Sequence, residues 1–519
     1  MIVVLLAIPL LGAVLAYLAP GAAPRRLVLV LTGVAHAAVA ATTWVAAPSP
    51  RLAGWLALDP LGRLFLSVAS ALFLASAVYG VAALRRELPG EREDFEEGLL
   101  FDNAPEATFA ACLLLFLAAM TLVTVSQAFG LLWVGVEATT LASAPLIYFH
   151  RHHRSLEATW KYLLICSVGI ALALLGNFFL AVAVGGRAPG AQQLGLPELL
   201  RDAKSLDPVW LKAAFLLFLV GYGTKMGLAP LHTWLPDAHS EAPSVVSALL
   251  SGALLNCALL GIIRAQQVCV AAGQGAFGQE LLVGFGLLSM GVAAVFIPGQ
   301  PDYKRMLAYS SVEHMGITSL GIGLGGVGTF GAMLHAVNHS LTKAALFFVA
   351  GNILAEYRSK STAEVRGVLR ILPASGVLWV AGLFAITGTP PFGSFLSELI
   401  VLDAALGQGG SRSRRRTSSS WPSSSSACRA PRSAWRRGRR PAQGGRGRSR
   451  CWESHLPRRS PRWPSCWASG SLPPSGPRSI SPPARSDDAP PAQRAAGRAA
   501  GDSGARDRRL QSRRPRGSR

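Results

Sequence analysis

Ionisable side chains stand inside several long apolar stretches of this 519-residue chain. A charged side chain at the centre of a bilayer costs roughly 2.5 to 3.5 kcal/mol on insertion scales, so each one is a functional hypothesis by default. Carboxylates, amines and imidazoles bind and release protons, and such a set therefore predicts proton transfer through a membrane. The residues concerned are Glu137, Lys161, Lys225, Glu313, His335, His339, Lys343 and Glu398.

Three of these residues form a regular series. His335, His339 and Lys343 follow one another at intervals of four residues, which stacks them on one face of a helix and predicts a polar seam. A histidine pair at this spacing can bind a metal ion, but no carboxylate or third ligand accompanies the pair in the sequence. A proton relay is therefore favoured over a structural role, and both are favoured over a metal site.

Lys225 ends the apolar run AAFLLFLVGYGT and stands just before a Gly/Pro-rich break. A lysine that is alternately paired with and separated from a carboxylate binds and releases a proton, because burial opposes its charged form and the carboxylate favours it. Arginine would stay charged in the same position. We expect Glu137 to be this carboxylate. Lys161 starts its apolar stretch, so it fits either a relay residue or a side chain that snorkels to the membrane surface.

The elements that must position these residues are apolar stretches of about 18 to 25 residues, long enough to cross a bilayer. They predict an all-α, polytopic membrane protein of roughly twelve transmembrane helices, since open sheets do not exist in lipid. The first span is expected to be a retained helix, not a signal peptide. The predicted spans are 1–19, 27–47, 61–83, 107–126, 129–149, 161–184, 211–226, 243–263, 281–298, 306–324, 328–353 and 373–406.

Lys and Arg residues gather in alternate loops along the whole series, beginning with Arg25 and Arg26. Basic loops stay on the cytoplasmic side, so the N-terminus is predicted to lie outside the cytoplasm. We expect the plasma (inner) membrane of a bacterium to be the location.

Two spans are interrupted by glycine and proline. The seventh breaks at GLAP and the twelfth at TGTPPFG, and the fifth and tenth spans each carry a glutamate. Broken helices at corresponding places indicate an inverted-repeat transporter. We therefore predict two inverted five-helix repeats, 107–264 and a truncated 279–408, after N-terminal transmembrane helices in 1–106.

The end of the chain has a different composition. Residues 409–519 contain 27 Arg, no Lys and 5 acidic residues, a net charge of 27 − 5 = +22, which equals the net charge of the whole chain. The basic character therefore says nothing about the membrane part, and no nucleic-acid partner is expected. Arginine without lysine is typical of a GC-rich gene translated out of frame, so a frameshift is favoured over a disordered tail that binds lipid or RNA.

Four segments carry a resemblance to a known family. The chain resembles, from about residue 1 to 406, the antiporter-like proton-translocating subunits of respiratory complex I, membrane-bound hydrogenases and Mrp cation/proton antiporters, with hydrogenase-4 component F as the nearest likeness. The segments are WVGVEATTLASAPLIYF, GYGTKMGLAPLHTWLPDAHSEAPS, DYKRMLAYSSVEHMG and HAVNHSLTKAALFFVAGNI.

The resemblance implies roles for individual residues. Glu137 and Lys225 match the glutamate–lysine pair of the family, and Glu398 matches the exit-side residue of the second broken helix. Residues His335, His339 and Lys343 match the central hydrophilic axis, and His232 and His239 would lie beside the first break. One position departs from the pattern. Asn256 stands where many relatives have a lysine, so protons would pass there through water or neighbouring histidines.

The expected function is proton translocation by a membrane subunit of a redox-driven complex, of the hydrogenase-4 or NADH:quinone oxidoreductase type. The alternatives are an Mrp-type cation/proton antiporter subunit and a non-functional truncated product. No cofactor is expected in this chain, and its partners would be other membrane and redox subunits that carry Fe–S, NiFe or flavin groups.

Overall fold

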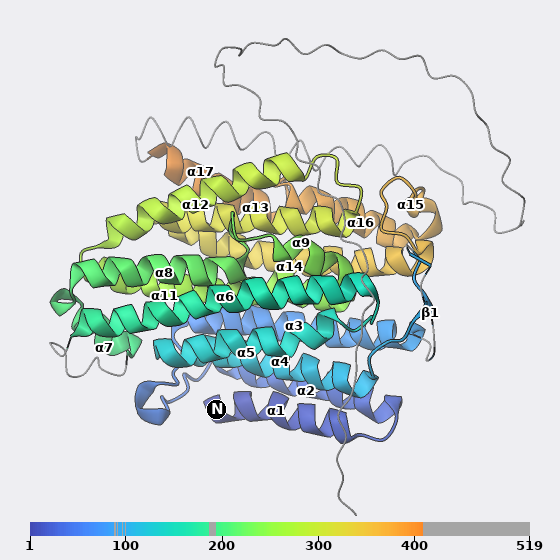
Figure 1. Ribbon diagram of the computed structural model, residues 1–519, viewed down its shortest axis with the longest axis horizontal. Coiled ribbons are helices and arrows are strands. Elements are labelled where there is room, and N and C mark those ends of the chain that lie inside the picture. Colours follow the sequence, from blue (N-terminus) through green and yellow to red (C-terminus); the bar gives the residue numbers. More distant parts are fainter. Residues whose placement is uncertain (88–89, 91, 96, 99, 186–193, 408–519) are drawn as a thin grey trace, which may run out of the picture. The chain divides into compact units, whose positions relative to one another are not determined.

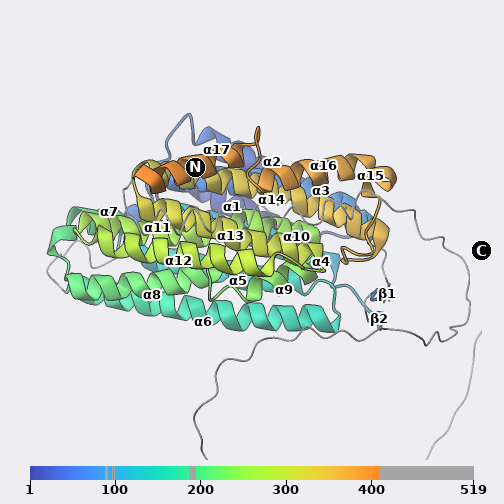
Figure 2. The same ribbon diagram turned by 90° about the horizontal axis from the view of Figure 1, so that it is seen from above.

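A computed structural model describes residues 1–407, except 88–89, 91, 96, 99 and 186–193. The predicted tail, 409–519, lies outside the described residues. The described part belongs to one compact unit and is almost entirely helical, and its long helices run side by side in both views (Figures 1 and 2).

Most helices follow one another with short connections, and longer segments join α2 to α3 and α3 to α4. A small antiparallel ribbon between α3 and α4 pairs β1 (Arg92–Glu93) with β2 (Leu100–Phe101). Two 3-10 turns, η1 (Leu52–Gly54) and η3 (Ala203–Ser205), and one π-helical turn, η4 (Leu250–Leu254), interrupt the series. The helices are α1 (Ile2–Leu18), α2 (Ala22–Thr42), α3 (Pro60–Arg86), α4 (Glu106–Val125), α5 (Phe129–Ile147), α6 (His153–Val184), α7 (Leu196–Arg201), α8 (Pro208–Met226), α9 (Trp234–Glu241), α10 (Ser244–Leu249), α11 (Leu255–Ala271), α12 (Gly275–Phe296), α13 (Tyr303–Leu324), α14 (Val327–Tyr357), α15 (Val368–Ile371), α16 (Pro373–Ile386) and α17 (Gly393–Gly407).

The predicted spans are confirmed as helices. Within the described residues, ten of the twelve ranges each coincide with one helix, the eighth contains α10, η4 and α11, and the twelfth contains α16 and α17. The first break follows α8, where the seventh range ends, and the second break divides the twelfth range. By length and composition, eight of these units are apolar enough to cross a membrane, and α1 and α16 are shorter apolar helices. The remaining two, α13 and α14, each carry three buried Lys, Glu or His side chains, which are Lys304, Glu313 and His314 on α13 and His335, His339 and Lys343 on α14. The inverted symmetry of the two halves stays a prediction.

Several helices extend beyond the predicted spans, and charged residues explain three of these cases. Helix α2 begins before Arg26, which pairs with Glu106 at 2.8 Å, and α6 begins eight residues before Lys161. Helix α11 continues past Arg264, a buried residue whose Nη2 lies 3.0 Å from Asp59 Oδ1. An apolar window ends at a charge, but a helix continues when the side chain reaches a partner or the surface.

Burial separates central from peripheral helices. The unit Ser244–Ala271 is buried along the whole of its apolar window, against 28 % for α2 and α12, so it lies at the centre of the bundle. Glycines bring neighbouring helices into backbone contact. A side chain at Gly221 of α8 would lie 2.6 Å from Gly169 O of α6, and one at Gly286 of α12 would lie 2.7 Å from Gly316 O of α13. Close approach at small residues is the usual way in which membrane helices pack.

The two breaks have similar backbones. Helix α8 ends at Met226 and is followed by Gly227 with φ +84°, and α16 ends at Ile386, shortly before Gly388 with φ +58°. Glycine adopts these left-handed conformations without the penalty of a Cβ atom. Each break also contains a cis peptide bond, Ala229–Pro230 in the first and Pro390–Pro391 in the second.

Candidate functional site

Lys225 is held at the end of α8 by two hydroxyl groups. Its side chain is 0 % exposed, and its Nζ donates to Thr140 Oγ1 of α5 at 2.8 Å and to Tyr162 OH of α6 at 2.5 Å. The ammonium nitrogen also lies 4.4 Å from the centre of the Tyr162 ring, a cation–π contact. The last turn of a helix favours a cation, because its free carbonyls carry partial negative charge. The break after Met226 thus provides the site for this lysine.

Glu137 is one hydroxyl group away from Lys225. Thr140 Oγ1, which accepts the hydrogen bond from Lys225, lies 3.3 Å from Glu137 Oε2 and can donate to it. Within the described residues the carboxylate and the ammonium are joined through this hydroxyl instead of by a direct ion pair. Glu137 is half-buried, whereas Lys225 is fully enclosed.

Thr140 and Tyr162 were missed in the sequence, although a signal exists for the first. Thr140 and Ser143 follow Glu137 at intervals of three residues and therefore share its side of α5. Ser143 Oγ donates to Thr139 O at 2.7 Å and lies 2.6 Å from Tyr162 OH, so the phenol donates to Ser143 while it accepts from Lys225. Tyr162 resembles any core tyrosine in the sequence, and only packing places it here.

The three residues of the predicted column on α14 are buried. His335, His339 and Lys343 are all at most 1 % exposed. Lys343 Nζ donates to Leu307 O and Ser310 Oγ, both on α13. The three side chains therefore follow the contact between α13 and α14.

His314 of α13 completes this column and was missed in the sequence. Its Nδ1 lies 2.9 Å from His335 Nε2, and its ring centre lies 5.3 Å from that of His339. His335 Nδ1 lies in turn 3.0 Å from Ser397 Oγ of α17. The signal was its place beside Glu313 in SVEHMG, but nothing in the sequence indicates that α13 turns this side toward α14.

Glu313 and Glu398 lie near one another at the second break. Both are 7 % exposed, and they are close enough to interact electrostatically. Glu398 packs against the break itself, because a side chain at Gly388 would overlap its Oε2 atom. The structure thus brings Glu313 toward Glu398 at the second broken helix.

The predicted histidines of the first break occupy different environments. His239 of α9 is fully buried and stacks on Phe347 of α14 with ring centres 5.1 Å apart. In the part of the chain that the structure describes, neither ring nitrogen of His239 has a hydrogen-bond partner. It interacts electrostatically with Lys343 and His339, so it faces the column. His232 is 7 % exposed and lies beside Tyr309.

Asn256 connects the centre of the bundle to the column. Its Nδ2 donates to Ser340 Oγ of α14 at 2.8 Å, while its buried Oδ1 has no hydrogen-bond partner within residues 1–407 as far as they are described. It follows the π-helical turn η4, whose Gly252 touches α14, because a side chain there would lie 3.0 Å from Ser340 O. Such π-turns often mark functional sites. Its neighbour Cys257 interacts electrostatically with Lys225, so Asn256 stands between the two lysine sites.

Lys161 lies outside this buried set. Its side chain is 45 % exposed, and its Nζ pairs with Glu157 at 2.7 Å and with Asp237 of α9 at 2.9 Å. Asp237 also pairs with Arg305 of α13 at 2.8 Å. This placement agrees with a residue near the membrane surface, and the relay role of Lys161 stays a prediction.

A second polar cluster, missed in the sequence, lies at the last residue of α9, outside the predicted apolar spans. Glu241 Oε1 lies 2.8 Å from Lys360 Nζ, and Glu241 Oε2 lies 3.8 Å from His152 Nε2. Burial alone would raise the pKa of Glu241, but attraction to Lys360, together with their hydrogen bond, Arg154 and Lys304, lowers it to about 2. The Glu241 carboxylate is therefore ionised at neutral pH.

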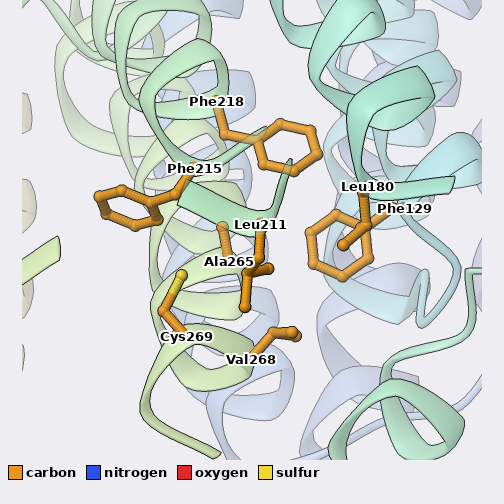
Figure 3. A pocket seen from close by; sticks show the side chains of 8 residues that line it. All are labelled: Phe129, Leu180, Leu211, Phe215, Phe218, Ala265, Val268 and Cys269. Carbon is orange, nitrogen blue, oxygen red and sulfur yellow. The ribbon is translucent and has the colours of Figure 1, made fainter. Parts of the chain in front are cut away.

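A small pocket lies apart from these residues (Figure 3). It is bounded by side chains of α5, α6, α8 and α11, all of them apolar except for a thiol. A binding site normally adds a few convergent polar groups to such a lining, and this pocket has none. Its residues are Phe129, Leu180, Leu211, Phe215, Phe218, Ala265, Val268 and Cys269.

Comparison with known proteins gives consistent matches. Residues 126–411 match the family model described as NADH:quinone oxidoreductase/Mrp antiporter, TM. A protein of Methylacidiphilum infernorum named hydrogenase-4 component F homolog is 42 % identical over 288 residues, which is 55 % of this chain and 60 % of that relative. The chain thus spans less than two thirds of the length of this relative.

Solved structures share the fold. The membrane-bound sulfane sulfur reductase, an archaeal respiratory membrane complex, contains a chain that matches with a TM-score of 0.74 at 20 % identity, over 84 % of this chain and 88 % of that one. A chain of respiratory complex I from Thermus thermophilus matches with a TM-score of 0.67 at 21 % identity, over 85 % and 91 %. The family model covers more than half of this chain, including Glu137, Lys225, Lys343 and Glu398. The chain is therefore a multi-pass membrane protein that belongs to the NADH:quinone oxidoreductase/Mrp antiporter family.

Proposed function

We propose that this chain is a proton-translocating membrane subunit of a redox-driven complex, of the hydrogenase-4 or NADH:quinone oxidoreductase type. The observation that carries the proposal is Lys225, an amine with no exposure to solvent whose counter-carboxylate, Glu137, is one hydroxyl group away. Ionisable residues inside a membrane are rare because their burial costs free energy, and where they occur they mark ion and proton pathways.

The geometry suggests how Lys225 binds and releases a proton. In the arrangement described, Thr140 and Tyr162 solvate the ammonium and Glu137 is held at the far side of Thr140. A small displacement of the flexible lysine side chain toward Glu137 would form a direct ion pair and stabilise the charged form. Separation from Glu137 would leave the Lys225 amine in a buried site that disfavours its protonated, charged form. Partner subunits would drive this change between the two arrangements.

The second half also contains a series of buried proton-binding groups. Lys343 is fully buried on α14, one helical turn from His339, and His314, His335 and Ser397 continue the series toward Glu398. His239 and Asn256 lie between the first and second halves. We propose that protons pass among these groups, with water bridging Asn256, since an amide side chain does not bind a proton at neutral pH.

The proposed partners follow from the same function. Electrons would be handled by redox subunits that carry Fe–S, NiFe or flavin groups, while this chain supplies the proton path. The similarity to the protein named hydrogenase-4 component F homolog supports the hydrogenase-type complex. We propose the plasma membrane of a bacterium as the location, and the alternation of basic loops supports an N-terminus outside the cytoplasm.

A second candidate is an Mrp-type cation/proton antiporter subunit. The observation that favours it is the pair of buried carboxylates, Glu313 and Glu398, beside a broken helix. Carboxylates and freed backbone carbonyls are ligands for a hard cation such as Na⁺. Under this alternative, proton movement would require Na⁺ or K⁺ and would not require electron transfer.

Inverted membrane vesicles that contain the complete complex test the proposal. With redox turnover measured in parallel, Lys225→Ala and Lys225→Arg are expected to reduce dye-detected vesicle acidification about tenfold or more, as for the loss of one positioned proton-transfer group. Lys212→Ala on the same helix α8 is the matched control, since Lys212 contacts the Phe277 ring and no buried carboxylate. Unchanged acidification in Lys225→Ala would refute the proposal. Acidification that follows a Na⁺ gradient without electron donors would favour the antiporter.

A further inference from the structure

We propose that His314, His335 and Glu398 form a binding site for a divalent transition-metal ion of the zinc class. The three side chains come from α13, α14 and α17, and each offers one ligand atom, all within 4.8 Å of one another. All three are buried. Facing side chains of a helical bundle are a common way of building a metal site from histidine and glutamate.

The donor set selects the class of ion. Two imidazoles and one carboxylate are the protein ligands of zinc sites that keep a fourth position open. Imidazole also suits Cu, Ni and Fe, whereas Mg²⁺ and Ca²⁺ prefer sites made of oxygen atoms alone. The site is therefore distinct from a Na⁺ or Ca²⁺ site.

Hydrogen bonds already orient the two imidazoles toward one point. Ser397 Oγ donates to Ser394 O at 2.9 Å, so it accepts from His335 Nδ1, and the lone pair of His335 then lies on Nε2. That atom faces His314 Nδ1 at 2.9 Å. A hydrogen bond to the far nitrogen is how proteins fix the tautomer of a metal-binding histidine. An ion between the two nitrogens would take the place of their shared hydrogen bond, and the proton of His314 Nδ1 would move to Nε2 of the same ring, so that Nδ1 offers its lone pair to the ion.

The spacing requires only side-chain movement. Ligand atoms of a tetrahedral zinc ion with bonds of about 2.0 to 2.1 Å are about 3.3 Å apart. The two nitrogens at 2.9 Å must therefore separate slightly, and the Glu398 carboxylate must approach. His339 lies 5.3 Å from His314 between ring centres, and both its nitrogens are buried without a hydrogen-bond partner among the described residues, so it is placed to supply or support a fourth ligand.

The sequence disfavoured a metal site because the histidine pair had no third ligand, and the packed helices supply one. The histidine pair at i and i+4 had no third ligand, but the grouping joins His335 to His314 and Glu398 instead of to His339. These ligands are separated by 21 and 63 residues in the sequence. If the proposed function is correct, an ion here would hold three of the proton-binding groups of the second half and would stop proton transfer through them.

Metal content and spectroscopy test the site independently of transport. The complete complex is dialysed against Zn²⁺ and analysed for bound metal, with wild type, His335→Gln and Glu398→Gln compared. We expect the wild-type complex to hold one more zinc ion per chain than either variant. His36→Gln is the control, since His36 is an equally buried histidine bound to Ser70 and Thr121 hydroxyls, and it should keep the ion. Equal zinc in all four proteins would overturn the proposal.

A second measurement needs no substitution. Co²⁺ added to the wild-type complex should give the strong visible absorption of a tetrahedral site, and Zn²⁺ should displace it. A weak octahedral spectrum would contradict the proposal. Vesicle acidification is then measured with Zn²⁺ and again after a chelator. If Zn²⁺ inhibits vesicle acidification reversibly and His335→Gln abolishes this inhibition, the bound ion acts on the proton path. Site-specific zinc binding without inhibition would leave the metal site in place and count against proton transfer through these groups.

Discussion

Lys225 and Glu137 are connected by the hydroxyl group of Thr140, which accepts from the ammonium at 2.8 Å and lies 3.3 Å from the carboxylate. The lysine is enclosed at the end of α8, and the glutamate lies half-buried on α5. A direct ion pair would hold the proton on the lysine. An intervening hydroxyl keeps the two charges coupled and leaves the lysine free to change its protonation state.

Removal of this bridge should impair proton transfer. Thr140→Val keeps the size of the side chain but deletes the hydroxyl, so we expect vesicle acidification to fall about tenfold or more. Leaving one buried polar group unpaired should also destabilise the protein by about 1 to 3 kcal/mol. Thr139→Val is the matched control, because its hydroxyl bonds only to Val136 O of its own helix. Equal acidification in the two variants would contradict the role of Thr140, and Thr140→Ser should restore most of the activity.

Asn256 should matter for passage between the two halves. Asn256→Leu removes the hydrogen bond to Ser340 Oγ and replaces the polar Oδ1 atom by an apolar group. We therefore expect slower vesicle acidification, while the complex still assembles. Asn177→Leu is the control, since Asn177 of α6 is also buried but has no hydrogen-bond partner on either amide atom. It should leave acidification unchanged and preserve or raise thermal stability. A transport defect of equal size in both variants would argue against a specific role for Asn256.

The Glu241–Lys360 pair predicts a pH-dependent contribution to stability. The pKa of Glu241 is lowered from an ordinary value of 4.5 to about 2, so the stabilisation is fully present above pH 4.5 and is lost as pH falls toward 2. Glu241→Gln should destabilise the protein at neutral pH by on the order of 3 kcal/mol. The difference from wild type should shrink as the pH is lowered below 4.5.

Thermal unfolding of the complex in detergent, recorded across this pH range, measures the effect. Glu364→Gln is the control, because Glu364 is exposed and bonded to Ser359. A stability loss in Glu241→Gln that did not vary with pH would show that the charge of Glu241 is not its cause.

Lys161 should contribute less to transport than Lys225. Water reaches its ammonium, and Glu157 and Asp237 keep it charged, so we expect Lys161→Ala to slow acidification by a smaller factor than Lys225→Ala. The comparison uses the same vesicles. An effect as large as that of Lys225→Ala would place Lys161 on the path itself.

The basic tail gives a prediction about the gene. Resequencing across the codons for Leu406 to Arg416 should reveal a second reading frame that continues into an apolar helix, because the arginine-rich composition is typical of out-of-frame translation. If the present frame is upheld and the protein is found at full length by mass spectrometry, the frameshift interpretation is wrong.

The sequence by itself determined the membrane class, the twelve spans and the two breaks, because apolar length and Gly/Pro punctuation are local properties. It also identified Lys225, Lys343 and Glu398 as buried, since a charge within an apolar stretch is visible in one dimension. Spans that begin or end at charges, such as those with Arg26 and Arg264, were drawn too short because the partners lie elsewhere in the chain.

Only the tertiary structure decided which groups meet. Thr140, Tyr162 and His314 are ordinary residues in the sequence, and they became part of the site because α5, α6 and α13 turn particular faces toward α8 and α14. Helix rotation and contact depend on the fit of many side chains across each interface, including glycines that admit a neighbouring backbone. A pattern along one helix carries no information about the partner face, so the metal-binding group of His314, His335 and Glu398 became visible only when the helices were packed.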